Sequence, residues 1–129
     1  MLTFDDQVHA VQWLVAEYLP TMVRFDRDLP SPEAIADALG GGRVDSIPIP
    51  ADCTDGFCHA WWQRPHAYLD PAVRASISAI ARLPNDVVDD GMARLRADLA
   101  SGAWERSHGD LLARTEIDAG YRLVVSPAA

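Results

Sequence analysis

The sequence predicts an α/β fold, and three observations indicate it. Residues Tyr121–Val125 combine aromatic and β-branched side chains as strands do, and their consecutive apolar residues suggest burial on both faces. Residues 43–49 alternate well enough for a second strand, and Pro48, which has no N–H to donate, places that strand at a sheet edge. Ser31 and Asp70 are each a helix cap followed directly by a first-turn proline.

The first half of the chain is expected to contain a short strand and two helices. The strand is Leu2–Phe4, and Asp5 or Asp6 caps the helix that follows. That helix ends at Pro20 and carries one apolar stripe, made of Val8, Val11, Leu14, Val15 and Tyr18. The second helix ends at residues 40–42, which are all glycine, and its buried side is made of Ile35, Ala36 and Leu39.

The second half is expected to contain two further helices and the last strand. One helix follows Asp70, ends by Pro84 and has an apolar stripe made of Val73, Ile77 and Ile80. The next begins directly after that proline and ends at Gly102, and its core face consists of Val88, Met92, Leu95 and Leu99. Residues 118–120 form a turn before the final strand.

Composition narrows the class of protein and its partners. A chain of 129 residues with 49% hydrophobic content has the size and core of a single domain, residues 1–129. The net charge of −8, with scattered arginines and no lysine, excludes a nucleic-acid or anionic membrane surface as a partner. No apolar run approaches the length of a membrane span and the N-terminus lacks the pattern of a signal peptide, so we expect a cytoplasmic protein. The arginine, alanine and aspartate bias is typical of a GC-rich, bacterial-like genome.

The order of these elements resembles the C-terminal half of the Rossmann-like (class I, type-11-like) S-adenosylmethionine-dependent methyltransferases. Residues 2–5 are similar to the end of the fifth strand of that fold, residues 31–41 to the helix after it, and residues 43–50 to the sixth strand. Residues 120–125 are similar to the seventh strand, which in that family lies antiparallel between the fifth and sixth. The resemblance implies a partial sheet of about three strands, with a helical insertion at about 51–117 before the antiparallel last strand.

An aromatic-rich segment at residues 50–71 supplies the candidates for contact with a small-molecule methyl acceptor. They are Asp52, Asp55, Trp61, Trp62, Arg64 and Tyr68. The aromatic rings can wall a pocket, the guanidinium can pair with an acceptor carboxylate, and either aspartate can orient a hydroxyl or an amine. The alternative is that the aromatic residues only anchor the insertion to the sheet. No catalytic residue is indicated.

The histidines and cysteines do not predict a metal site. His59 and His66 lie seven residues apart with Cys58 nearby, but two further ligands at a familiar spacing are missing. His9 and His108 stand alone in the sequence, and Ser78 is expected on a helix surface.

The methyl donor of the family has no recognisable site in this sequence. The family holds S-adenosylmethionine with a glycine-rich turn after the first strand and an acidic residue at the end of the second. Residues 40–42 follow a helix and precede a strand, which is the reverse of the order that such a turn needs. We therefore expect the isolated chain to hold no cofactor and to be inactive by itself.

Three hypotheses follow from this expectation. The simplest is that Met1 is not the ancestral start and that the donor-binding half was encoded upstream. Alternatively, a separate polypeptide carrying the S-adenosylmethionine-binding half completes the chain through the open edge of its first strand. The third is a small non-enzymatic binding or interaction module, which includes a homodimer that buries the same edge.

Overall fold

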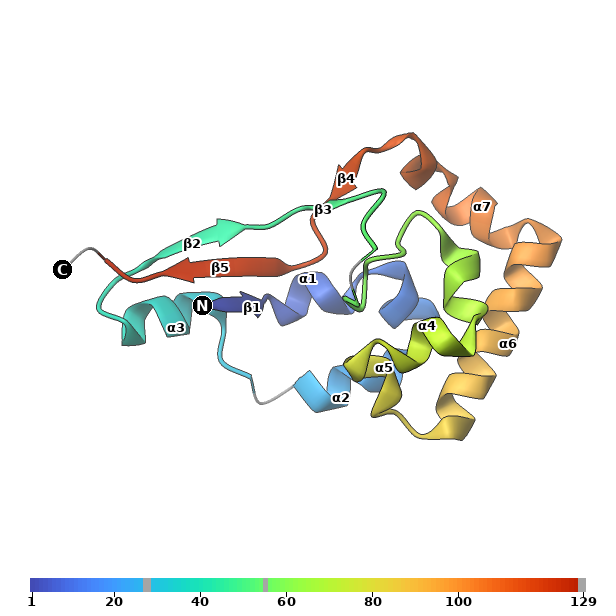
Figure 1. Cartoon of the computed structure of the whole chain (residues 1–129), viewed down its shortest axis with the longest axis horizontal. Helices are drawn as coiled ribbons and strands as arrows, with labels where there is room; N and C mark the ends of the chain where they lie inside the picture. The colour runs from blue at the N-terminus through green and yellow to red at the C-terminus, as the bar shows by residue number, and fades with distance from the viewer. Residues whose placement is uncertain (27–28, 55, 128–129) are drawn as a thin grey trace.

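The sheet has three strands, with the last strand of the chain in its centre (Figure 1). The structure, a computed structural model, describes residues 1–26, 29–54 and 56–127. The strands β1 (Leu2–Phe4), β2 (Arg43–Ser46) and β5 (Tyr121–Val125) lie in the order β1-β5-β2. Since β5 is antiparallel to both neighbours, β1 and β2 run parallel to each other. This confirms the predicted α/β sheet and the antiparallel last strand.

The predicted edge strand is divided at Pro48. β2 ends at Ser46, and the two-residue strand β3 (Ile49–Pro50) pairs instead with β4 (Glu116–Ile117). The reason is the missing N–H of Pro48, because a proline cannot continue the ladder with β5. The β3–β4 pair brings together the two ends of the helical insertion.

The expectation that β5 is buried on both faces was wrong. Val124 is 1% exposed, whereas the neighbouring Leu123 is 37% exposed. Successive side chains of a strand point to opposite faces of the sheet. Helix α3 (Pro32–Ala38) packs against β5 and β2, and the face that carries Leu123 is more accessible.

The first predicted helix is interrupted. α1 (Asp6–Ala10) is capped by Asp5, whose carboxylate accepts a hydrogen bond of 3.0 Å from the backbone N–H of Gln7. Val11, predicted to be buried, is 72% exposed, and the chain turns there before the π-helical turn η1 (Leu14–Tyr18). A regular α-helix points consecutive side chains about 100° apart, so it cannot bury a run of adjacent residues on one side. The interruption allows Trp13, Leu14 and Val15 all to be buried.

The cap and the glycine stop of the second predicted helix are confirmed, and a short helix that was not predicted precedes it. After a 3₁₀ turn at Pro20–Met22 comes α2 (Val23–Asp26), and α3 begins with Ser31 Oγ accepting from the N–H of Ala34 at 3.1 Å. Gly40 and Gly41 end α3 with φ values of 88° and 91°, which strain side chains other than glycine. Leu39, predicted to be buried, is 42% exposed.

The insertion is helical, and one of its predicted helices is broken. The helix expected from Asp70 to Pro84 is divided into α4 (Pro71–Ala75) and α5 (Ser78–Ala81), because Ile77 is extended and buried at the junction. α6 (Asn85–Ser101) is continuous and ends at Gly102 with a φ of 83°, as predicted. The remaining elements are the 3₁₀ turns η3 (Pro65–Leu69) and η4 (Gly109–Ala113) and the helix α7 (Ala103–His108).

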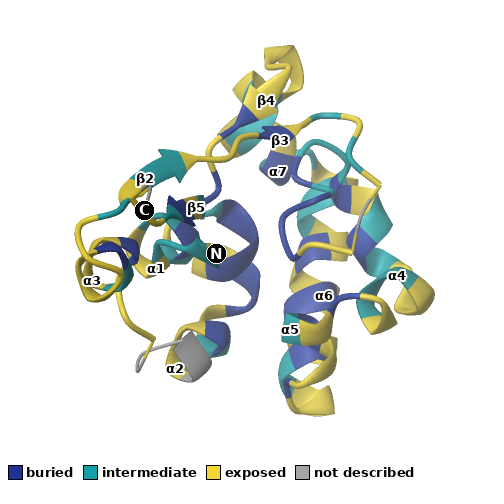
Figure 2. Ribbon diagram, turned by 60° about the vertical axis from the view of Figure 1, so that its left-hand side comes forward, coloured by how far each residue is buried: buried dark blue, intermediate teal, exposed yellow. Residues whose placement is uncertain are grey.

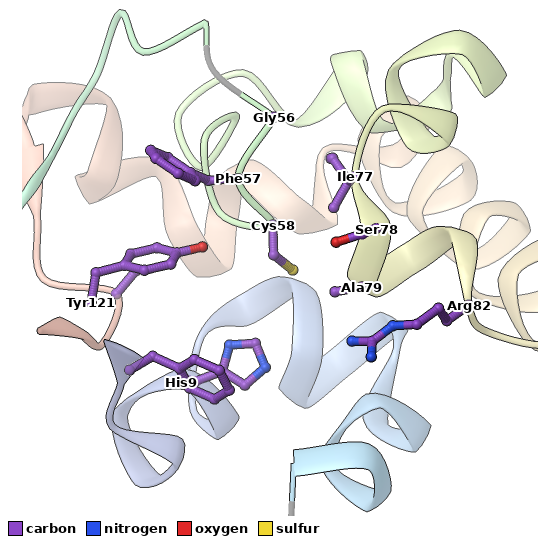
Figure 3. Close-up of a pocket in the computed structure, with 11 residues that line it drawn as sticks. His9, Gly56, Phe57, Cys58, Ile77, Ser78, Ala79, Arg82 and Tyr121 are labelled. Atoms are coloured by element: carbon purple, nitrogen blue, oxygen red, sulfur yellow. The ribbon is translucent and has the colours of Figure 1, made fainter. Parts of the chain in front are cut away.

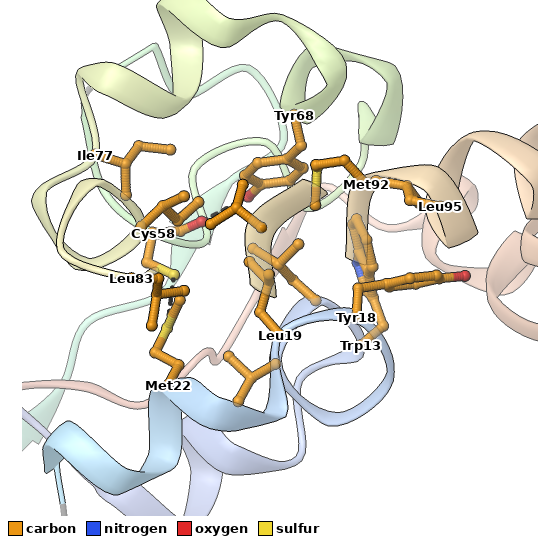
Figure 4. Packing of buried hydrophobic residues seen from close by; sticks show 14 of the residues in the cluster. Trp13, Tyr18, Leu19, Met22, Cys58, Tyr68, Ile77, Leu83, Met92 and Leu95 are labelled. Carbon is orange, nitrogen blue, oxygen red and sulfur yellow. Dashed lines mark hydrogen bonds between the residues drawn. The ribbon is translucent and has the colours of Figure 1, made fainter. Parts of the chain in front are cut away.

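The main core joins the segment after α1 to the insertion (Figure 4). Trp13, Leu19 and Met22 pack there with Tyr68, Met92 and Leu95. In Figure 2, buried residues occur in the segment after α1 and along α6. A smaller cluster of Ile49, Trp62, Ile117 and Ala119 lies at the β3–β4 pair. In the part of the chain that the structure describes, no helix combines the length and the apolar content needed to cross a bilayer.

Candidate functional site

A cavity of about 240 Å³ lies where β1 ends and β5 begins (Figure 3). Phe4 and His9 line it from β1 and α1, and Tyr121 lines it from the first position of β5. The insertion supplies the other walls, through the residues around Phe57 and through α5. In sheets with parallel strands, ligands bind beyond the carboxyl ends of those strands, and this cavity lies beyond the carboxyl end of β1.

The wall of this cavity includes one of two histidines that contact each other. His9 Nδ1 and His59 Nε2 lie 2.7 Å apart, within hydrogen-bonding distance, although the two residues are 50 positions apart in the sequence. His9 is 7% exposed and His59 is 2% exposed. Burial, and to a lesser extent the neighbouring His9, lower the pKa of His59 to about 3, so that this ring is neutral at physiological pH. A neutral His59 can accept the Nδ1–H of His9, which fixes the orientation of the ring that faces the cavity.

The turn before β5 brings the backbone close to this histidine. Gly120 has a φ of 101°. A Cβ atom at this position would lie 2.9 Å from the Asp5 carbonyl oxygen and 3.1 Å from the backbone nitrogen of His9. Asp118 Oδ1 accepts from the N–H of Gly120 at 2.9 Å. The predicted turn at residues 118–120 therefore positions both Tyr121 and α1 at the cavity.

The cavity has an aromatic side. The rings of Phe57 and Tyr121 have centroids 5.4 Å apart, and those of Phe4 and His9 are 5.2 Å apart. Burial raises the pKa of the Tyr121 phenol, as does the nearby Cys58, so the phenol is protonated and can donate a hydrogen bond.

The opposite side of the cavity carries a positive charge. Figure 3 shows Ser78 Oγ and the Arg82 guanidinium extending from α5 toward the enclosed space. Among the described lining residues, Arg82 is the one arginine, and none is a carboxylate. The charge of the described cavity lining is therefore positive, whereas the net charge of the whole chain is −8.

The three aromatic candidates from the sequence lie in the packing of the insertion. Trp62 is 1% exposed, and its indole N–H donates to the Pro50 carbonyl at 3.3 Å. The fully buried Tyr68 donates to the Cys58 carbonyl at 2.7 Å and accepts from the N–H of Trp61 at 3.2 Å. Burial raises the pKa of the Tyr68 phenol. These contacts are those expected of residues that anchor the insertion.

The charged candidates are dispersed around the molecule. The Arg64 guanidinium stacks on the Trp61 ring at 4.4 Å and donates to the carbonyl of Cys53, and it borders a separate cavity beside Trp104. Asp52 is exposed and borders another cavity. Asp55 lies outside the described residues. None of the described candidates lines the 240 Å³ cavity, and their contact with an acceptor stays a prediction.

Sequence reasoning missed the residues that do line this cavity. His9 stood alone in the sequence. Ser78 is exposed at the start of α5, as expected of a helix-surface residue, and it also borders the cavity. The one available signal was the position of His9, a few residues beyond the end of a predicted strand, where α/β sheets place their ligands. Among the described residues, no group of three or more histidine, cysteine or acidic side chains could hold a metal ion.

Comparison with known proteins identifies the fold. No protein-family model matches the chain. No curated protein matches it. Among solved structures, a crystal structure from Anabaena variabilis ATCC 29413, described as a "putative methyltransferase from antibiotic biosynthesis pathway", superposes with a TM-score of 0.84 at 32% sequence identity. The match covers 98% of this chain and 53% of the Anabaena chain, so this chain spans about half the length of that relative. The predicted partial methyltransferase-like fold is thereby confirmed.

Proposed function

We propose that this chain is the acceptor-side half of an S-adenosylmethionine-dependent small-molecule methyltransferase, and that the 240 Å³ cavity holds the methyl acceptor. The fold likeness supports the reaction class. The observation that carries the assignment of the cavity is the hydrogen-bonded pair of His9 and His59 on its wall. An oxygen or nitrogen acceptor must give up a proton when it is methylated, and histidine is the side chain that most often takes such a proton.

In this proposal, different residues around the cavity have different roles. The His9 ring lies on the cavity wall and is the proposed acceptor of the proton, while His59 holds its Nδ1 atom and so orients the ring. The Nε2 atom of His9 is buried, so proton transfer to it requires that the ring be uncovered when the acceptor binds. Phe57 and Tyr121 provide a flat apolar wall, which aligns a small acceptor and excludes water. The insertion contributes one side of the cavity and the β1–β5 end of the sheet contributes the other.

Among the described residues, we find no strand-to-helix turn suited to the methyl donor. In the described part, β1 is the strand that runs directly into a helix, and the connecting residue is Asp5 rather than a glycine-rich turn. Gly40 and Gly41 terminate α3 instead. The positions of Asp5, Gly40 and Gly41 support the proposal that another segment or polypeptide holds the donor. In that case the 129-residue chain does not transfer methyl groups by itself.

The first experiment is a calorimetric titration of the purified chain with S-adenosylhomocysteine, the demethylated form of the donor. We expect no heat beyond that of dilution. Saturable binding would show that a donor site exists on these residues, and the proposal of a donor-less half would then be abandoned.

A complementation experiment tests the acceptor role. The chain is coexpressed with the portion of the Anabaena protein that it does not cover, and methyl transfer from labelled S-adenosylmethionine to a panel of small phenols and amines is measured. We expect transfer by the complex and a loss of roughly 100-fold or more when His9→Gln is introduced. Equal rates for the two complexes would remove His9 from the mechanism.

The alternative is a non-enzymatic module that keeps the cavity and binds a small molecule. The observation that favours it is the same lack of a glycine-rich strand-to-helix turn among the described residues. A pull-down of this chain from its host distinguishes the half-enzyme hypothesis from the binding-module hypothesis. A copurifying polypeptide with a glycine-rich donor motif supports the half-enzyme, and a stable homodimer that retains a small ligand supports the binding module.

A further inference from the structure

We infer that the ligand of the 240 Å³ cavity is a single-ring aromatic carboxylate. Its carboxylate lies at Arg82, and its ring lies among the aromatic side chains. The role of this ligand as a methyl acceptor rests on the proposed function. The binding itself requires no methyl donor and can be tested separately.

The charge of the cavity selects an anion. No described residue forms an ion pair or a hydrogen bond with the Arg82 side chain, and the described lining of the cavity contains no carboxylate. The guanidinium extends from the C-terminal end of α5 toward the cavity (Figure 3), and Arg82 is exposed, so the anion would bind at the solvent-accessible side of the cavity. A guanidinium can bind a carboxylate through two parallel hydrogen bonds, a geometry that a lysine ammonium group does not offer. Ser78, one turn earlier on α5, presents a hydroxyl that can donate to the same group.

The size and the walls of the cavity select one aromatic ring. Its volume of about 240 Å³ is below the usual range of sites for drug-sized ligands, roughly 300–1,000 Å³. An engineered apolar cavity of about 150 Å³ is sufficient for benzene, so a ring with two small substituents is a suitable size. Phe4, Phe57 and Tyr121 surround the space with ring faces and edges, the partners that aromatic ligands prefer.

The test compares 4-hydroxybenzoate with its neutral isostere 4-hydroxybenzamide, using ligand-observed NMR on the whole 129-residue chain without any cofactor. We expect the acid to bind at least about tenfold more tightly than the amide at low salt, and the preference to shrink as salt is added. In Arg82→Gln the preference should fall to near unity, and in Arg82→Lys part of it should remain because the charge is kept.

The matched control is Arg96→Gln, which removes an exposed arginine from α6, away from the cavity. This variant should keep the full preference for the acid. Equal binding of acid and amide to the wild-type chain, binding of neither, or a preference that survives Arg82→Gln would each overturn the inference. If the acid preference is present but the complemented complex transfers no methyl group, the ligand class stands and the proposed enzyme function fails.

Discussion

The buried imidazole of His59 makes the stability of this protein depend on pH. Its pKa is about 3 in the folded chain, against 6.5 for an unperturbed histidine. Between these two values the unfolded chain binds a proton at this position and the folded chain does not. The free energy of unfolding therefore decreases as the pH falls from 6.5 toward 3, by up to about 1.4 kcal/mol per pH unit from this residue.

His59→Asn removes the titrating group and should flatten this dependence. The measurement is urea denaturation at pH 6.5, 5.5 and 4.5, comparing the slopes of the free energy of unfolding against pH. We expect the variant to be less stable than wild type at pH 6.5 and to lose less stability on acidification. The exposed residue His66 provides the control, since His66→Asn should keep the wild-type slope. Equal slopes for all three proteins would contradict a neutral, buried His59.

At the level of elements, α6 approaches η1 so closely that position 91 accepts only glycine. A Cβ atom on Gly91 would lie 2.3 Å from the Tyr18 carbonyl oxygen and 3.0 Å from the Leu19 side chain. Arg94, one turn further along α6, donates to the same carbonyl at 3.2 Å and to that of Glu17 at 2.6 Å. The backbone of α6 at Gly91 therefore packs directly against the Tyr18 carbonyl, at the end of the π-helical turn η1.

Gly91→Ala should destabilise the protein although alanine is the better helix former. Helix propensity alone would favour alanine by about 1 kcal/mol, whereas the clash with backbone costs more, for a net loss of about 1–3 kcal/mol. Thermal and urea denaturation measure the change. Gly109→Ala is the control, because its Cβ would meet only the flexible Glu105 side chain at 3.4 Å and its φ is −61°. A more stable Gly91→Ala protein would show that α6 and η1 are further apart than described.

For the whole molecule, one face of the sheet exposes apolar side chains. Leu2 and Leu123 are register partners on neighbouring strands, so they lie on the same face, and they are 57% and 37% exposed. Ile47 and Phe57 are 36% and 39% exposed, and both line a mostly apolar cavity together with Leu2. In the described sheet β1 pairs with β5 alone, which leaves its other edge open. Exposed apolar surface beside an open strand edge promotes association.

We expect the purified chain to self-associate in a concentration-dependent way. Light scattering over a range of concentrations should give an average mass that rises with concentration for the wild type and rises less for Leu123→Lys. Leu112→Lys, at another exposed leucine on η4, should behave as the wild type does. A wild-type chain that stays monomeric at high concentration and melts in one sharp transition would contradict the prediction.

The sequence by itself determined the features whose physical cause is local. The Asp5, Ser31 and Asp70 caps, the glycines that end α3 and α6, and the turn before β5 are all where the sequence predicted them. These signals act through backbone groups a few residues away. Resemblance to a known fold supplied the antiparallel position of β5, which its residues alone do not specify.

Only the tertiary structure decided the helix breaks at Val11 and Ile77 and the choice of residues that line the cavity. After the first break, Trp13, Leu14 and Val15 all enter the core, whereas at the second break the single extended residue Ile77 does. Both demands are set by distant packing partners rather than by periodicity. The cavity joins His9, Arg82 and Tyr121, whose separations in the sequence carry no motif. Such a site arises because the insertion folds back across the end of the sheet, and a contact between segments dozens of residues apart leaves no local pattern to read.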